Sequence, residues 1–146
     1  MNIGLIEITP EQVTGLNRSV VEKARQWNPK SQEQDVLVRP GDLKSCIGAV
    51  FQQLHPIGYV HLPLEKMAGL LLFRIAEGQF FRDANKRTAL LSTITFLHNN
   101  GHQLRVERDT VRNLLWGFAK PMTGGPAKCD ELDAIQFVCD NILPVT

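Results

Sequence analysis

The sequence predicts an all-α protein, a bundle of about six helices. Apolar residues recur at intervals of three and four over most of the 146 residues, which is the period of a helix with one buried face. Turn formers combine with strand-favouring residues in only one short segment, 55–61, so strand content should be minimal. No repeat, low-complexity run or linker divides the chain, and its length suits one core. We therefore expect a single domain over residues 1–146.

The first helix is predicted to begin at Pro10. Thr9 is a favoured N-cap, Pro10 suits the first helical position, and Gln12 stands where a capping box needs it. The apolar stripe of this helix is Val13, Leu16, Val20, Ala24 and Trp27. Residues 28–34 are polar, include a proline, and end the helix as a loop.

The second helix is predicted to open at residues 39–42, which include Pro40 and Asp42. Its apolar stripe is Leu43, Ile47, Val50, Phe51 and Leu54. After it, Pro56 and Gly58 break the helical period, and the segment 55–61 is predicted to be a loop or a short hairpin.

A central helix is predicted from Leu62 to Ala76, because nearly every face of that segment is apolar and neighbours must surround it. Gly78 ends it, and a second largely buried helix is predicted from Asn85 to Asn99. Two more helices are marked by the stripes Val111, Leu114, Leu115, Phe118 and Leu132, Ile135, Val138, Cys139, Ile142.

The bulk composition argues against several classes of protein. The net charge of +1 is too small for a protein that grips a nucleic-acid backbone. The N-terminus lacks the basic start of a secretory signal, and the longest apolar run is far too short to cross a membrane. Three cysteines without a CxxC pair, Cys46, Cys129 and Cys139, read as reduced and mostly buried thiols. We expect a cytoplasmic protein.

The segment 79–88 is the most charged part of the apolar middle of the chain. Lys86 and Arg87 fall in the first turn of a predicted helix, where the positive end of the macrodipole makes each unfavourable by ~0.3 to 1 kcal/mol. An anion held by the backbone N–H groups of Ala84, Asn85 and Lys86 would compensate for both cations. The sequence therefore predicts a phosphate-binding loop.

Asp83 has a role beside such phosphates, since a lone carboxylate can hold Mg²⁺ together with phosphate oxygens and water. The alternative is that Asp83 or Asn85 only caps the helix. The two cations would then be solvated or would pair with Glu65 or Glu77.

The loop resembles the signature of the Fic/Doc family, HxFx[D/E][G/A]N[G/K]R, which Phe81 and residues 83–87 match. It is most similar to the death-on-curing (Doc) branch, which typically reads DANKRTAL, as residues 83–90 do here. The opening ITPEQV and the helix end FLHNNG are also similar to that branch, so the resemblance covers about Thr9 to Phe118.

The resemblance implies binding of Mg²⁺ and of ATP or another nucleoside triphosphate, with transfer of part of the nucleotide to a protein hydroxyl. Family members with Gly after the Asn typically transfer AMP. Doc-like members with Lys there, as Lys86 is here, phosphorylate a threonine of elongation factor Tu. By resemblance Asp83 is the metal ligand, Asn85 and the backbone around Ala84 form the anion cradle, and Lys86 and Arg87 contact phosphates.

The segment 55–61 stands where the family has a flap that pairs with the target peptide as an added strand. The flap residues would be His55, Ile57, Gly58, Tyr59, Val60 and His61. The alternative is an ordinary turn between helices. The inhibitory string [S/T]xxxE[G/N] of some family members does not occur in the sequence. Restraint would then come from a separate antitoxin, by resemblance one of the Phd type.

Gln79 occupies the position of the family's catalytic histidine. An amide has no useful basicity near neutral pH, whereas a positioned general base contributes ~10² to 10⁴ in rate. His55 and His61 on the flap could approach the target as substitutes, whereas His98 and His102 lie at the far end of a helix, ~20 Å away. We therefore expect this chain to keep nucleotide binding while the transfer reaction is slow or absent.

Three hypotheses follow. The first is a Doc-like kinase or nucleotidyltransferase weakened by Gln79. The second is a non-catalytic module that keeps the nucleotide pocket, or a groove for a protein partner, in a regulatory role. The third is a helical scaffold or nucleic-acid binder in which the charged loop is merely a helix cap.

Overall fold

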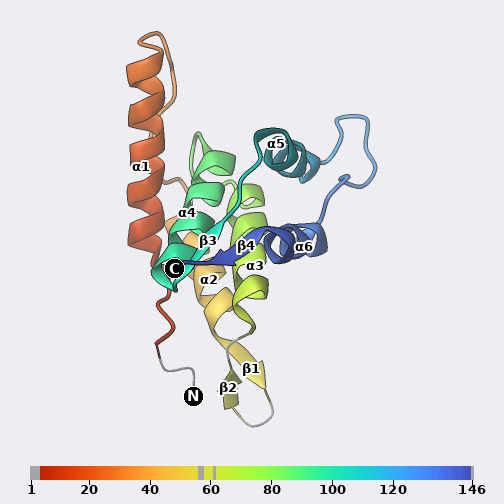
Figure 1. The fold of residues 1–146 in the computed structure, drawn as a ribbon. Helices are drawn as coiled ribbons and strands as arrows, with labels where there is room; N and C mark the ends of the chain where they lie inside the picture. Colours follow the sequence, from red (N-terminus) through yellow and green to blue (C-terminus); the bar gives the residue numbers. More distant parts are fainter. Residues whose placement is uncertain (1–3, 56–57, 61, 146) are drawn as a thin grey trace.

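A computed structural model describes residues 4–55, 58–60 and 62–145. Within these residues the chain forms six helices and four short strands (Figure 1). The helices are α1 (Pro10–Trp27), α2 (Pro40–Phe51), α3 (Leu64–Glu77), α4 (Asn85–Asn99), α5 (Arg108–Gly117) and α6 (Glu131–Asn141). The strands are β1 (Gln53–His55), β2 (Gly58–Val60), β3 (His102–Leu104) and β4 (Ile142–Pro144). The all-α prediction is confirmed.

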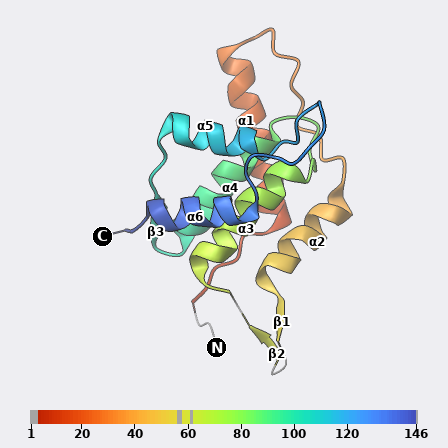
Figure 2. The same ribbon diagram turned by 90° about the vertical axis from the view of Figure 1, so that its right-hand side faces the viewer.

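Helix α3 is central, as its apolar sequence predicts. It packs against α2, α4 and α6, and eight of its residues are buried. Figure 2 shows α3 and α4 in the middle of the molecule with α2 and α6 on either side. The approach of α6 requires Gly69, because a Cβ at this position would lie 2.5 Å from the Cα of Ile135.

Helix α1 begins as expected but buries a different face. Thr9 accepts a hydrogen bond from the Gln12 N–H, and the reciprocal bond completes the capping box. The buried residues are Val13, Asn17 and Val21, whereas Trp27 is 82% exposed. The predicted apolar stripe was therefore wrong at Trp27, and the buried face includes a polar residue, Asn17, that the prediction lacked.

The segment predicted as a loop or hairpin forms an antiparallel hairpin of β1 and β2, in which His55 is opposite Gly58 and Leu54 is opposite Tyr59. Of the expected flap residues, Ile57 and His61 lie outside the described residues. A second small sheet pairs β3 with β4 and so ties the chain after α6 to the end of α4. No helix in the described part of the chain is long and apolar enough to span a membrane.

The cysteines depart from the sequence prediction of mostly buried thiols. All three are free; Cys46 and Cys129 are half-buried, and Cys139 on α6 is exposed. Burial raises the pKa of the Cys46 thiol, an effect that the charge of Arg74 partly offsets. The prediction for Cys139 was wrong because α6 buries Ala134, Phe137 and Val138, and Cys139 does not lie on that face.

Candidate functional site

The loop between α3 and α4 turns sharply at both of its ends. Gln79 has φ 51° and Ala84 has φ 65°, and both therefore adopt the left-handed conformation that is uncommon outside glycine. Between them, Phe80 and Phe81 are 4% and 2% exposed and anchor the loop in the core. Gly78 precedes the turn, and a Cβ there would lie 2.2 Å from the Phe80 ring. Packing thus fixes the backbone of the motif.

Asn85 holds the motif loop closed from within. Its Oδ1 accepts a hydrogen bond from the Phe81 N–H at 3.0 Å, and its Nδ2 donates to the Phe81 carbonyl at 2.8 Å. The same Nδ2 lies 3.5 Å from Oε1 of Gln79. The side chain of Asn85 is buried and hydrogen-bonded within the loop, so it positions the loop.

Asn17 on α1 supports the loop from the opposite side. It is 1% exposed, and its Nδ2 donates to the Asp83 carbonyl at 2.9 Å and to Oγ1 of Thr88 at 3.0 Å. One amide thus joins the end of the motif loop to the first turn of α4. Sequence reasoning missed this residue. Its only signal was an Asn flanked at three- and four-residue intervals by apolar positions.

An extended segment, 34–39, runs beside the motif loop and was also missed. The Val38 N–H donates to the Phe80 carbonyl at 2.8 Å, and the Arg82 N–H donates to the Val36 carbonyl at 2.9 Å. Leu37 and Phe81 form an antiparallel bridge between these hydrogen bonds. The run Val36-Leu37-Val38 carried a β-strand signal that the polar residues before it obscured.

No side chain caps the start of α4. Its N-cap is Ala84, and neither Asp83 nor Asn85 makes a side-chain cap hydrogen bond. The first-turn N–H groups have no partner within the helix, and they are the positive end of the macrodipole. Asp83 instead accepts a hydrogen bond on Oδ2 from the Gln34 N–H at 2.9 Å. Its Oδ1 accepts none from the described residues and can take a metal ion.

The two cations of the first turn have different surroundings. Arg87 forms an ion pair with Glu33, which lies in the connection between α1 and α2. Lys86, in contrast, lies near Glu77. Partial burial raises the pKa of the Glu77 carboxyl, and the positive charges of Lys86 and Lys120 oppose that shift. Arg87 thus pairs with Glu33, and not with Glu65 or Glu77, which were the partners considered from the sequence.

A cavity of about 680 Å³ lies over this helix start, within the range typical of small-molecule sites. Gln79, residues 82–87 and Leu90 form one side. The other side is formed by α5 and the residues before it: Val106, Arg108, Val111, Arg112, Leu115 and Trp116. The cavity brings together the predicted residues 83–87 and Gln79, and no histidine is among the described residues that line it.

A triphosphate and its metal fit these residues. Uncapped N–H groups and two cations suit the phosphates, and the open oxygen of Asp83 suits Mg²⁺. Among the described residues no three His, Cys, Asp or Glu side chains gather to hold a metal. Mg²⁺ bound here would therefore depend on phosphate oxygens and water for most of its ligands.

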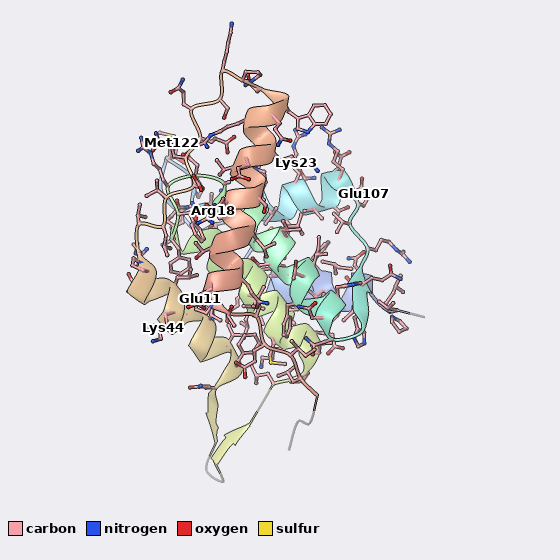
Figure 3. The ribbon with its side chains drawn as sticks, turned by 90° about the vertical axis from the view of Figure 1, so that its left-hand side faces the viewer. Glu11, Arg18, Lys23, Lys44, Glu107 and Met122 are labelled. Carbon is pink, nitrogen blue, oxygen red and sulfur yellow. The ribbon has the colours of Figure 1, made fainter. Side chains whose placement is uncertain are left out.

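A larger hollow of about 1280 Å³ lies elsewhere, between the first half of α1 and α2. Glu11 and Arg18 of α1 and Lys44 of α2 border it, and these side chains are labelled in Figure 3. It contains no residue of the motif loop. The charges along its lining are mixed, so it offers less specific chemistry than the smaller cavity.

The predicted flap and the motif loop lie at opposite ends of α3, as Figures 1 and 2 both show. The hairpin carrying His55, Gly58, Tyr59 and Val60 precedes α3, and the loop follows it. The 14 residues of α3 span about 21 Å. The structure therefore does not bring these residues to the cavity. His98 and His102 lie at the far end of α4, as expected.

Comparison with known proteins gives one family. The model of the Fic/DOC family matches residues 7–97, a range that contains the motif loop, Asn17 and segment 34–39. Two curated relatives also match: envelope glycoprotein L of Murid herpesvirus 1, strain K181 and strain Smith. Each is 28% identical over 98 residues, which cover 66% of this chain and 36% of the relative. The chain thus spans about a third of the length of these relatives.

Proposed function

Because the chain belongs to the Fic/DOC family, we propose that it binds Mg²⁺ and a nucleoside triphosphate, ATP in the first instance, over the start of α4. We further propose that it transfers a phosphoryl or AMP group to a hydroxyl of a protein substrate, at a rate lowered by Gln79. The observation that carries this proposal is the cavity over an uncapped helix start, lined by Asp83, Lys86 and Arg87.

The start of α4 supplies the phosphate site. The N–H groups of Asn85, Lys86 and Arg87 occupy the first turn, where hydrogen bonding and the helix dipole both favour an anion. Lys86 adds a point charge, and Arg87 can clamp two oxygens once it leaves Glu33. Mg²⁺, when bound at Asp83, would neutralise charge on the phosphate oxygens.

Gln79 limits the proposed reaction. In the family, a histidine at this position takes the proton from the attacking hydroxyl. The Gln79 amide can accept or donate a hydrogen bond and so orient the hydroxyl, but it cannot remove the proton. Its neighbour Asn85 is occupied by the backbone of Phe81. Among the described residues that line the cavity, no histidine takes the place of the missing base.

Lys86 favours phosphoryl transfer and the Doc branch. Residues 83–90 read DANKRTAL, and Doc-like proteins with this string phosphorylate elongation factor Tu and are restrained by a Phd-type antitoxin. We propose the same target and the same kind of partner here, in a toxin–antitoxin pair. The positions of the strands favour segment 34–39 over the β1–β2 hairpin for pairing with the target peptide, since that segment lies beside the motif loop.

The test is Gln79→His, which should create Mg²⁺-dependent labelling of a protein target by radioactive ATP. The backbone at residue 79 tolerates the change, since histidine is among the residues enriched in the left-handed conformation. A gain of ~10² to 10⁴ in rate is expected from a positioned base. Label from the γ-phosphate but not from the α-phosphate would identify phosphoryl transfer.

The control is Asp83→Ala in the Gln79→His background, which should abolish the labelling. Purified elongation factor Tu and a whole lysate serve as targets. If the histidine variant labels no protein in either, although it binds Mg-ATP, the proposed transfer is wrong.

One observation favours a second function, that of a nucleotide-binding module without catalysis. The cavity has cations and a helix start that suit phosphates, yet no histidine is among the described residues that line it. In this case wild type and Gln79→His bind Mg-ATP equally in calorimetry, and neither changes cell growth. A growth defect that appears only with the histidine would exclude this second function.

A further inference from the structure

The groups proposed to bind phosphate lie on only one side of the cavity. The side formed by α4 and the motif loop carries Asp83, Lys86 and Arg87, whereas α5 contributes apolar residues and two arginines. Of these, Val111 and Leu115 are 5% and 7% exposed and belong to the core. Trp116, one residue further along α5, is 62% exposed. A large aromatic side chain is therefore presented to the cavity.

The indole of Trp116 is held by a neighbour one helical turn away. The guanidinium carbon of Arg112 lies 4.7 Å from the centroid of the indole ring, a cation–π contact. Both side chains line the cavity, and together they form a flat, cationic and aromatic surface. A surface of this kind binds planar aromatic groups, and a base stacked on an aromatic side chain is a common example.

The charge of the cavity points to the same ligand. Among the described residues of its lining are five lysines or arginines, namely Arg82, Lys86, Arg87, Arg108 and Arg112, and one carboxylate, Asp83. A cationic cavity with an exposed indole favours a ligand that is anionic at one end and aromatic at the other. A nucleoside triphosphate has both parts, and a simple polyphosphate or a peptide has one.

We infer that α5 is the base-binding wall of this site, where Trp116 and Arg112 stack on the base while the start of α4 holds the phosphates. This inference rests on the proposed function. Among the described residues of this wall, only Arg108, Arg112 and the indole N–H of Trp116 are polar, and Arg112 lies over the indole ring. Stacking on the face of the base therefore carries the binding, and both ATP and GTP should bind.

The experiment compares Mg-ATP with magnesium tripolyphosphate, which has the phosphates but no base. Trp116→Ala should lower the affinity for ATP about 5- to 150-fold, the range expected for loss of one stacked base, and should leave that for tripolyphosphate unchanged. Trp116→Phe should recover part of the loss. The matched control is Trp27→Ala, which removes the other, 82% exposed tryptophan and should change neither affinity.

Fluorescence gives a second readout on the same protein. Trp27→Phe leaves Trp116 as the only indole, since the chain has two tryptophans. ATP and GTP should quench its emission and tripolyphosphate should not. If wild type binds neither ATP nor tripolyphosphate, the proposed function itself fails. If both bind and Trp116→Ala loses no affinity for ATP, the phosphate site stands and the base-binding role of α5 is overturned.

Discussion

Asn17 shows how one side chain far from the motif in sequence can determine its shape. It is buried, 66 residues before Asp83, and donates to the Asp83 carbonyl and to the Thr88 hydroxyl. Because both acceptors lie at the junction of the motif loop and α4, the amide fixes how the loop enters the helix. This role is structural, since Asn17 does not line the cavity.

Replacement of Asn17 by alanine should destabilise the protein. The change leaves the Asp83 carbonyl and the Thr88 hydroxyl without their partner, at a cost of about 1–3 kcal/mol for buried groups. Urea denaturation would measure it, and ATP affinity should fall as the loop loosens. Asn113→Ala, at an exposed position of α5, is the control and should change stability by less than about 0.5 kcal/mol. Equal effects of the two variants would contradict this role.

Among the elements, α5 has an unusual start. Its N-cap is Glu107, whose carboxylate accepts hydrogen bonds from the backbone N–H groups of Asp109 and Thr110 and from the Thr110 hydroxyl. These hydrogen bonds, the Thr110 hydroxyl first, hold the pKa of Glu107 below its ordinary value. The carboxylate therefore orders the beginning of the helix that carries Trp116.

The lowered pKa predicts a pH dependence. The stabilisation by Glu107 should be fully present above the pKa of an unfolded glutamate, about 4.3, and should be lost as the pH falls through the lower pKa of the folded protein. Wild type should therefore exceed Glu107→Gln in unfolding free energy at pH 7, and the difference should shrink towards pH 3. Thr110→Val, which removes only the hydroxyl donor, should reduce the pH dependence part of the way. A constant difference would contradict the assignment.

Helix positions followed from the sequence because the apolar period and the turn residues act locally. The predicted boundaries of α4, Asn85 and Asn99, are those observed, and Pro10 and Pro40 begin α1 and α2. The faces of α1 and α6 were less predictable, since the sequence does not show which neighbour each helix meets. Asn17 is an example: it reads as polar surface, and only its distant partners make its burial favourable.

The site was predictable where it is continuous in sequence. Residues 83–87 lie together in the cavity because they form one turn. The α5 wall, segment 34–39 and Glu33 come from distant parts of the chain, and their contacts arise only from packing. The β1–β2 hairpin was placed at the site by resemblance to the family flap, and the 14 residues of α3 separate it from the motif.

At the scale of the whole molecule, the close contact between α3 and α6 depends on Gly69. A methyl group there would lie 2.5 Å from the Ile135 backbone, which cannot yield as a flexible side chain can. Since α3 ends at the motif loop, this contact holds the helix that leads into the site.

Gly69→Ala should therefore destabilise the fold by about 1–3 kcal/mol, the usual cost of overpacking, despite the better helix propensity of alanine. Thermal unfolding would measure the change. Gly48→Ala in α2 is the matched control, because a methyl group there meets nothing within 4 Å. That variant should gain about 0.4–1 kcal/mol. A Gly69→Ala protein as stable as the control would show that α6 can move away at little cost.

The pairing of Glu33 with Arg87 means that the proposed phosphate site already has a counter-ion beside it. A nucleotide that takes Arg87 exchanges one anion for another, so its affinity should fall less steeply with added salt than five cationic lining residues imply. Nucleotide binding as proposed would therefore leave Glu33, in the connection between α1 and α2, without its ion-pair partner.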